Sequence, residues 1–225
     1  MGKNVTLKSA DGFELSAYTA EPAGTPKGGV VVIQEVFGVN GHIRSIVDKY
    51  AAAGYTAIAP ALFDRIEPGI ELGYEQDDVT KGIELARGKT DIGKAVDDVR
   101  AAAAAIGSTG KIGVVGYCWG GLVTAISAIR SSDLFDAASA YYGGGTPTLA
   151  DQHPVVPMIM HYGEQDHAIP IADVDKLRAA WPQVTFHIYD AGHGFNCDQR
   201  GSFDAAAAKL AQERTLAFFS EHLVG

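Results

Sequence analysis

Short apolar runs alternate with amphipathic segments along most of the chain. Runs rich in β-branched and aromatic residues predict strands at 3–8, 13–19, 30–33, 55–59, 111–115, 135–142, 155–162 and 184–189. Apolar positions at helical spacing predict helices at 42–53, 72–87, 91–106, 122–129, 171–180 and 203–222. Asp11 and Gly12 form a hairpin signal between the first two strands, and Asp91 is a suitable N-cap for the third helix.

The alternation of strands and helices indicates an α/β protein. It predicts a mostly parallel central sheet with helices on both faces. The run from Val30 to Ile33 is apolar at every position, as expected for a strand buried on both faces. We find no internal repeat, low-complexity tract or interdomain linker in the 225 residues, so we expect a single domain over 1–225.

Three reactive side chains follow three of the predicted strands. Cys118 lies in GYCWGG, directly after strand 111–115, where Gly-x-Cys-x-Gly between a strand and a helix has the layout of a nucleophile elbow. Asp166 follows strand 155–162, and His193 follows strand 184–189. Because the carboxyl ends of parallel strands meet at one edge of a sheet, we expect these residues to lie together. The order Cys, Asp, His is the one that α/β-hydrolases use.

These positions have complementary roles in acyl transfer. His193 would take or hold the proton of the Cys118 thiol, and Asp166 would orient its imidazole. The backbone amides of Trp119 and Val36 would form an oxyanion hole. Cysteine in place of the usual serine predicts a covalent acyl-thioester intermediate.

Each assignment has a structural alternative. A cysteine at this position could be an inert, buried small hydrophobe, and Glu164 or Asp190 could replace Asp166 as the acid. Glu35 follows an apolar strand, and a buried carboxylate must be paired or protonated. It would either accept a hydrogen bond from the resting thiol as a gate or hold its loop through backbone hydrogen bonds.

The overall charge narrows the classes of partner. A net charge of −9 argues against nucleic acid or an anionic membrane, because both require basic patches. The N-terminal segment has no apolar signal-peptide region, and no stretch approaches the length of a membrane span. The two cysteines do not form a disulfide framework, so we expect free thiols and a cytoplasmic location. As partner we expect a small-molecule substrate, and we expect a monomer.

Metal and cofactor signals are weak. His193 and Cys197 are four residues apart, and Cys118 is another soft donor, so zinc must be weighed. The segment GHGFN is not helix-like and no Cys-x-x-Cys pair occurs, so we expect no metal site in this protein. No Gly-x-Gly-x-x-Gly follows a strand, and we expect no cofactor.

Taken together, the motifs resemble the dienelactone hydrolase (carboxymethylenebutenolidase) family, which has the α/β-hydrolase fold. The matching stretches are QEVFGVNGHIR at 34–44, GYCWGG at 116–121, YYGGG at 141–145, YGEQDHAIP at 162–170 and AGHGFNCDQR at 191–200. They are spread from the end of the third predicted strand to the last helix, so the resemblance extends over nearly the whole chain. The resemblance implies a triad of Cys118, Asp166 and His193. It also implies that Glu35 holds the thiol at rest and releases it when substrate enters.

The resemblance further implies a site for a substrate carboxylate, which the family binds with arginines. One of these is carried over to Arg65. The other lies four residues after the catalytic histidine, where this chain has Cys197, and Arg200 is out of register. Because Cys197 replaces this arginine, it stays an open question whether dienelactone itself is the substrate. Tyr141 and Tyr142 would line the pocket, although tyrosine in a strand more often packs in the core.

Thiol chemistry limits the substrate independently of the family. A thiolate leaves more readily than an amine, so an intermediate formed on an amide would revert to substrate, whereas lactones and activated esters would react forward. We therefore predict a cysteine-dependent hydrolase of small lactones or activated esters. The alternatives are a carboxylesterase or thioesterase of relaxed specificity and a binding or redox-sensing protein that uses Cys118 and Cys197.

Overall fold

One eight-stranded sheet runs through the computed structural model, which describes residues 2–224. Met1 and Gly225, the ends of the expected domain, lie outside the described residues. The strand order is β1-β2-β4-β3-β5-β6-β7-β8, with β2 antiparallel to β1 and β4 and all other pairs parallel. The strands are β1 (Lys3–Lys8), β2 (Glu14–Ala20), β3 (Gly29–Ile33), β4 (Thr56–Pro60), β5 (Ile112–Tyr117), β6 (Ala137–Tyr141), β7 (Met158–Gly163) and β8 (Thr185–Tyr189). The predicted mostly parallel sheet is confirmed.

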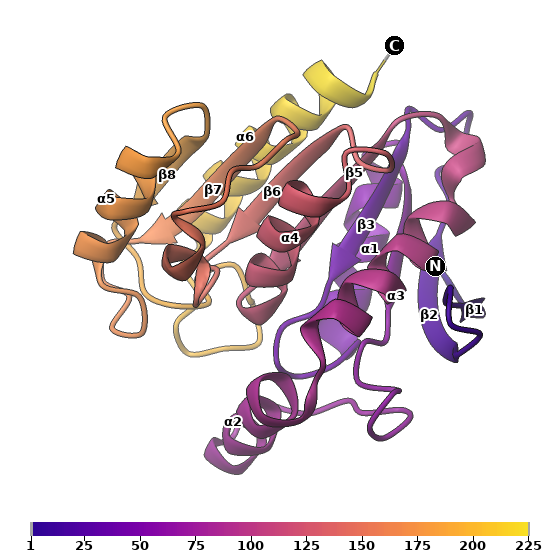
Figure 1. Cartoon of the computed structure of the whole chain (residues 1–225), viewed down its shortest axis with the longest axis horizontal. Helices are drawn as coiled ribbons and strands as arrows, with labels where there is room; N and C mark the ends of the chain where they lie inside the picture. Colours follow the sequence, from indigo (N-terminus) through magenta and orange to yellow (C-terminus); the bar gives the residue numbers. More distant parts are fainter. Residues whose placement is uncertain (1, 225) are drawn as a thin grey trace.

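Helices cover both faces of this sheet. In Figure 1, α3 and α4 lie in front of it, and α1 and α6 lie behind it. The helices are α1 (Gly41–Ala52), α2 (Gln76–Ile83), α3 (Ile92–Ala105), α4 (Trp119–Arg130), α5 (Ile171–Ala180) and α6 (Ala205–Leu223), with short turns η1 (Glu84–Lys89), η2 (Gly107–Thr109) and η3 (Thr146–Leu149). Asp91 caps α3 as predicted, since its carboxylate accepts the amides of Gly93 and Lys94. Among residues 2–224, no helix has both the length and the apolarity needed to cross a membrane.

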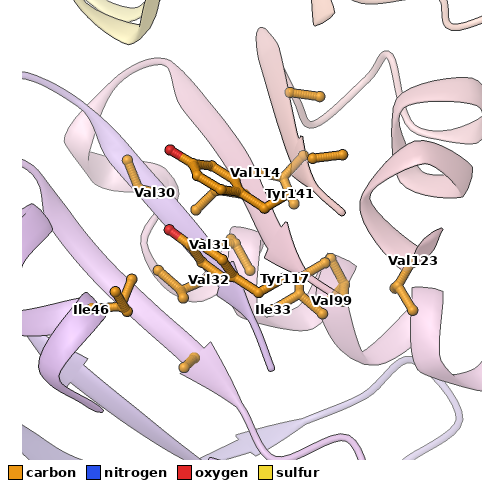
Figure 2. Packing of buried hydrophobic residues seen from close by; sticks show 14 of the residues in the cluster. Val30, Val31, Val32, Ile33, Ile46, Val99, Val114, Tyr117, Val123 and Tyr141 are labelled. Atoms are coloured by element: carbon orange, nitrogen blue, oxygen red, sulfur yellow. The ribbon is translucent and has the colours of Figure 1, made fainter. Parts of the chain in front are cut away.

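The central strands are buried on both faces. All five residues of β3 are buried, and Val31 pairs with Val114 of β5. Figure 2 shows the two valines among other buried aliphatic side chains, with the rings of Tyr117 and Tyr141 alongside. This packing fixes β5 and its neighbours, and with them the loops at their carboxyl ends.

The predicted helix at 72–87 is shorter and less regular than expected. Leu72 donates its backbone N–H to Phe37, which ties it to the loop after β3. The helix begins only at Gln76, after a capping box formed by Glu75 and Asp78. It then widens into η1, a π-helical turn. The helix therefore starts later than predicted, because Leu72 is bound to a loop that is distant in sequence.

Arg65, in the loop after β4, binds two carboxylates. Its guanidinium donates to Asp98 of α3 at 2.7 and 2.8 Å and to Asp11 at 2.9 and 3.0 Å. Because Asp98 is fully buried, the bidentate pair compensates a charge that water cannot reach. The structure thus differs from the expectation that Arg65 anchors the substrate. The guanidinium is occupied and joins the hairpin turn to α3.

We predict that Arg65→Ala destabilises the protein. Asp98 would remain buried without its partner, which typically lowers the free energy of unfolding by about 3 kcal/mol. Urea unfolding of the variant and the wild type measures the difference. The matched control is the double variant Arg65→Met/Asp98→Leu, which should recover most of the loss because it removes both charges. Wild-type stability of Arg65→Ala together with a raised KM would contradict this structural role.

Candidate active site

Cys118 occupies a sharp turn between β5 and α4. Its backbone has φ 55° and ψ −119°, a conformation that non-glycine residues rarely adopt. Two glycines allow this turn to form. A Cβ on Gly116 would lie 2.1 Å from the carbonyl oxygen of Gly120, and a Cβ on Gly120 would lie 2.5 Å from that of Gln34. The strand, turn and helix therefore meet as in a nucleophile elbow, with the thiol at the carboxyl edge of the sheet.

The structure brings Cys118, His193 and Asp166 into one hydrogen-bonded line. The Nε2 atom of His193 lies 3.2 Å from Sγ of Cys118, and its Nδ1 atom lies 2.7 Å from Oδ2 of Asp166. The other carboxylate oxygen of Asp166 accepts the amides of Ala168 and Ile169. These amides fix the carboxylate, which in turn fixes the histidine tautomer with Nδ1 protonated.

The surroundings of His193 favour its protonated form. Burial alone would lower the pKa of the imidazole, but the hydrogen bonds to Asp166 and Cys118 outweigh burial and raise this pKa to about 10. At neutral pH the ring of His193 is therefore protonated.

The two residues expected to supply oxyanion-hole amides, Trp119 and Val36, both line the pocket at Cys118. Trp119 is the first residue of α4, so its N–H has no acceptor within the helix. Val36 follows β3 and lines the same pocket as Trp119 and Cys118. The positive end of the α4 dipole adds to the field at this point.

The thiol opens into a pocket of about 690 Å³. Its wall comes from the loops after β3, β5, β7 and β8, from α2 and η1, and from the segment before α6. The residues that contribute to it include Val36, Phe37, Val79, Ile83, Arg87, Cys118, Trp119, Gln165, His167, Ile169, Asp190, His193, Arg200 and Phe203. Arg65, Tyr141 and Tyr142 do not belong to this wall.

Sequence reasoning missed the wall formed by α2 and η1. Val79, Ile83 and Arg87 are spaced four residues apart, which places them along one side of a helical segment. That spacing was visible in the sequence, but nothing local showed which part of the fold the segment covers. Arg87 and Arg200 supply the positive charges that line the pocket. The sequence had led us to expect this role for Arg65.

Glu35 is buried close to this site without contacting the thiol. The side chain is fully buried, and neither carboxylate oxygen has a hydrogen-bond partner among residues 2–224. Nη1 of Arg200 lies 3.5 Å from Oε1. In this structure the hydrogen bond of Cys118 is with His193, so a gating contact between Glu35 and the thiol stays a prediction.

The two tyrosines expected in the pocket lie behind it. Tyr141 is buried in the core, and its hydroxyl bonds Thr215 of α6 at 2.7 Å. Tyr142 has a positive φ of 36° and packs edge-on against His193, with ring centroids 5.2 Å apart. The structure differs from the expectation here, because both rings are fully packed within the protein. Tyr142 instead supports the imidazole from behind.

Cys197, which stands at the position of a family arginine, is buried and is not in a disulfide. Burial, followed by the nearby Glu35 carboxylate, raises the pKa of its thiol to about 11. Its sulfur, an oxygen of Glu35 and a ring nitrogen of His42 lie within 4.8 Å of one another. This group shares Cys197 with the residues weighed for zinc in the sequence, but its other members are Glu35 and His42 instead of His193 and Cys118.

Comparison with known proteins identifies the family of this chain. The model of the dienelactone hydrolase family matches residues 15–223. The carboxymethylenebutenolidase of Pseudomonas putida is 32% identical, over 97% of this chain and 96% of its own. A Klebsiella pneumoniae protein described as a dienelactone hydrolase has a similar structure, with a TM-score of 0.84 and 27% identity over 98% of this chain and 100% of the other. An esterase of Pyrococcus furiosus shares the fold at 13% identity, with a TM-score of 0.71 over 99% of this chain and 93% of the other. The chain therefore belongs to the dienelactone hydrolase family, with its α/β-hydrolase fold, and is a carboxylic ester hydrolase.

Proposed function

We propose that this protein hydrolyses small lactones or activated esters through an acyl-thioester on Cys118. The observation that supports this most strongly is the line from Asp166 through His193 to Cys118, which ends in the pocket. Separations of 2.7 and 3.2 Å are those required for proton transfer and for activation of a nucleophile.

The proposed reaction has two halves. Sγ of Cys118 attacks the carbonyl carbon, and the carbonyl oxygen becomes an oxyanion that accepts the amides of Trp119 and Val36. The C–O bond to the leaving group then breaks, and the departing alkoxide takes the proton from His193. In the second half, His193 removes a proton from water, the hydroxide attacks the thioester, and the C–S bond breaks. The acid leaves and the imidazolium–thiolate pair is restored.

A thiolate suits substrates whose leaving group departs easily. An alkoxide of low basicity, such as an enolate or a phenolate, leaves the tetrahedral intermediate faster than the thiolate does. An amine leaves more slowly, so amides would return to substrate. The proposed nucleophile must remain a free thiol, and we therefore also propose a reducing compartment such as the cytoplasm.

The cations of the pocket favour a substrate that carries a carboxylate. Arg87 and Arg200 both line the wall around Cys118. The guanidinium of Arg200 forms an ion pair with Glu35 at 3.5 Å. It also lies over the ring of Phe37, 5.6 Å from the ring centroid. Since the Pseudomonas putida relative is a carboxymethylenebutenolidase, we propose a carboxylated lactone as substrate, with Arg87 as its anchor. The apolar side chains of Val79, Ile83 and Phe203 in the same wall favour the alternative, a carboxylesterase or thioesterase of relaxed specificity.

Replacement of the nucleophile tests the central step. We expect Cys118→Ala to reduce turnover of p-nitrophenyl acetate by at least about 10³-fold, because no covalent intermediate can form. Release of nitrophenolate measures the rate, and a thermal unfolding scan checks that the variant is folded. Turnover near the wild-type rate would refute the proposal. A wild type that lacks esterase activity and forms a Cys118–Cys197 disulfide under mild oxidant would favour redox sensing instead.

The protonation of His193 provides a second test. We expect its imidazole to stay protonated through neutral pH and to titrate near pH 10. Nitrogen NMR of the ring, recorded across the pH range, measures the midpoint. Asp166→Asn should lower this midpoint, because a neutral amide no longer stabilises the imidazolium charge. A wild-type midpoint near the ordinary value of about 6.5 would contradict the proposed ion pair.

A substrate panel tests the anchor. We expect Arg87→Met to raise KM for a carboxylated lactone by about 10- to 100-fold, because the variant loses a charge-assisted hydrogen bond to the substrate carboxylate. KM for neutral p-nitrophenyl acetate should remain close to that of the wild type. Arg87→Lys is the matched control and should retain part of the preference, since it keeps the charge but not the fork of donors. If neutral esters are better substrates for the wild type, the relaxed esterase is the correct alternative.

A further inference from the structure

A second group of reactive side chains lies beside the proposed catalytic line. Glu35 comes from the loop after β3, His42 from the first turn of α1 and Cys197 from the loop after β8. All three are buried, and one donor atom from each lies within 4.8 Å of the others. We call this group the Glu35–His42–Cys197 cluster.

The polar atoms of this cluster are unusually poorly satisfied. Both carboxylate oxygens of Glu35 and Nε2 of His42 are buried without a hydrogen-bond partner among residues 2–224. A buried polar atom left unpaired typically costs about 1–3 kcal/mol, and more when it belongs to a charged group. Such atoms are rare in folded proteins, and three of them in one cluster indicate a missing partner.

The orientation of His42 shows what kind of partner is missing. Its Nδ1 atom lies 3.2 Å from Oδ1 of Asp198, whose half-exposed carboxylate can accept but not donate. Nδ1 therefore carries a proton, and in the neutral ring Nε2 presents a lone pair to the cluster. A histidine that donates one ring N–H to a carboxylate and turns the other nitrogen inward is a recurrent arrangement at metal sites.

We propose that Glu35, His42 and Cys197 bind a divalent cation of the zinc class. A thiolate, an imidazole nitrogen and a carboxylate oxygen are the three donor types that Zn²⁺ uses, and three protein ligands leave a fourth position for water. Tetrahedral ligand atoms lie about 3.5 Å apart, so shifts of about 1 Å at the side-chain ends would close the site. On binding, the Cys197 thiol releases its proton to solvent, and the sulfur takes the metal in its place.

The charges around the cluster match this cation. With Cys197 as thiolate and Glu35 as carboxylate, the two negative charges balance one divalent ion, and the ring of His42 stays neutral. Arg200 lies 3.5 Å from Glu35 and also lines the pocket around Cys118. The proposal does not depend on the chemistry of Cys118.

Cobalt binding tests the proposal, because a Co²⁺–thiolate bond gives a charge-transfer band in the near ultraviolet. The full-length, tag-free protein is treated with a chelator and titrated with Co²⁺ alone, and Zn²⁺ is then added as a competitor. We expect one equivalent of Co²⁺ to bind with a thiolate band, and Zn²⁺ to abolish that band. Absence of the band at millimolar Co²⁺ would overturn the proposal.

Variants locate the metal. We expect Cys197→Ser to remove the thiolate band, and His42→Gln to weaken Co²⁺ binding by at least about 100-fold. Asp198→Asn, which leaves the three proposed ligands in place but removes the charge that faces His42 and Lys49, should weaken binding by about 10- to 100-fold. Cys118→Ser is the matched control and should leave the band intact. A band that survives Cys197→Ser, or that is lost in Cys118→Ser, would place the metal elsewhere and overturn the proposal.

Two further measurements distinguish a loss of metal binding from a failure to fold. Circular dichroism of each variant shows whether it is folded before the titration is interpreted. If Cys197→Ser does not fold, Glu35→Gln and His42→Gln, which keep the thiol, are titrated instead. Weakened binding in both supports the cluster, and unchanged binding in both overturns it.

Discussion

The arrangement of this site depends on the close approach of β5 to the start of α4. Gly116 meets the backbone of Gly120 at a distance that excludes any side chain, and Gly120 in turn meets the end of β3. This contact holds Cys118 at positive φ at the carboxyl edge of the sheet and makes Trp119 the first residue of α4, where its amide has no acceptor within the helix. The same contact sets the proposed nucleophile beside the loop after β3, which carries both Glu35 and Val36, a proposed oxyanion donor.

Around that turn, each neighbouring loop adds one element of chemistry. The loop after β7 supplies a carboxylate fixed by two amides, and the loop after β8 supplies an imidazole supported by the ring of Tyr142. Together they place a proton on His193 at neutral pH, opposite the sulfur. The loop after β8 also carries Cys197, which joins Glu35 and His42 in the second cluster. The two groups share one sheet edge, and Arg200 touches both the pocket and Glu35.

Much of this could be predicted from the sequence because the signals are local. The hairpin at Asp11 and Gly12, the cap at Asp91 and the strand–elbow–helix at Cys118 each depend on a few adjacent residues. The positions of Asp166 and His193 follow from the rule that loops after parallel strands share one edge. The family resemblance, which the comparisons confirm, rests on the same short stretches.

What could not be predicted depends on contacts between distant segments. Arg65 was expected at the substrate, but Asp98, 33 residues later, and the hairpin turn bind its guanidinium. Tyr141 bonds α6 through Thr215, and only the packed sheet shows that it faces away from the pocket. His42 in the first helix lies close to Cys197 in the loop after the last strand. No local sequence pattern reveals this proximity.

Trapping the acyl-enzyme tests the proposed covalent mechanism most directly. The protein is mixed with p-nitrophenyl acetate, quenched with acid during turnover, digested and analysed by peptide mass spectrometry. Catalysis through Cys118 should leave an acetyl group on the peptide that contains this residue, bound through a thioester that hydroxylamine removes. Turnover without an adduct on that peptide, or an acetyl group on another residue during turnover, would contradict it.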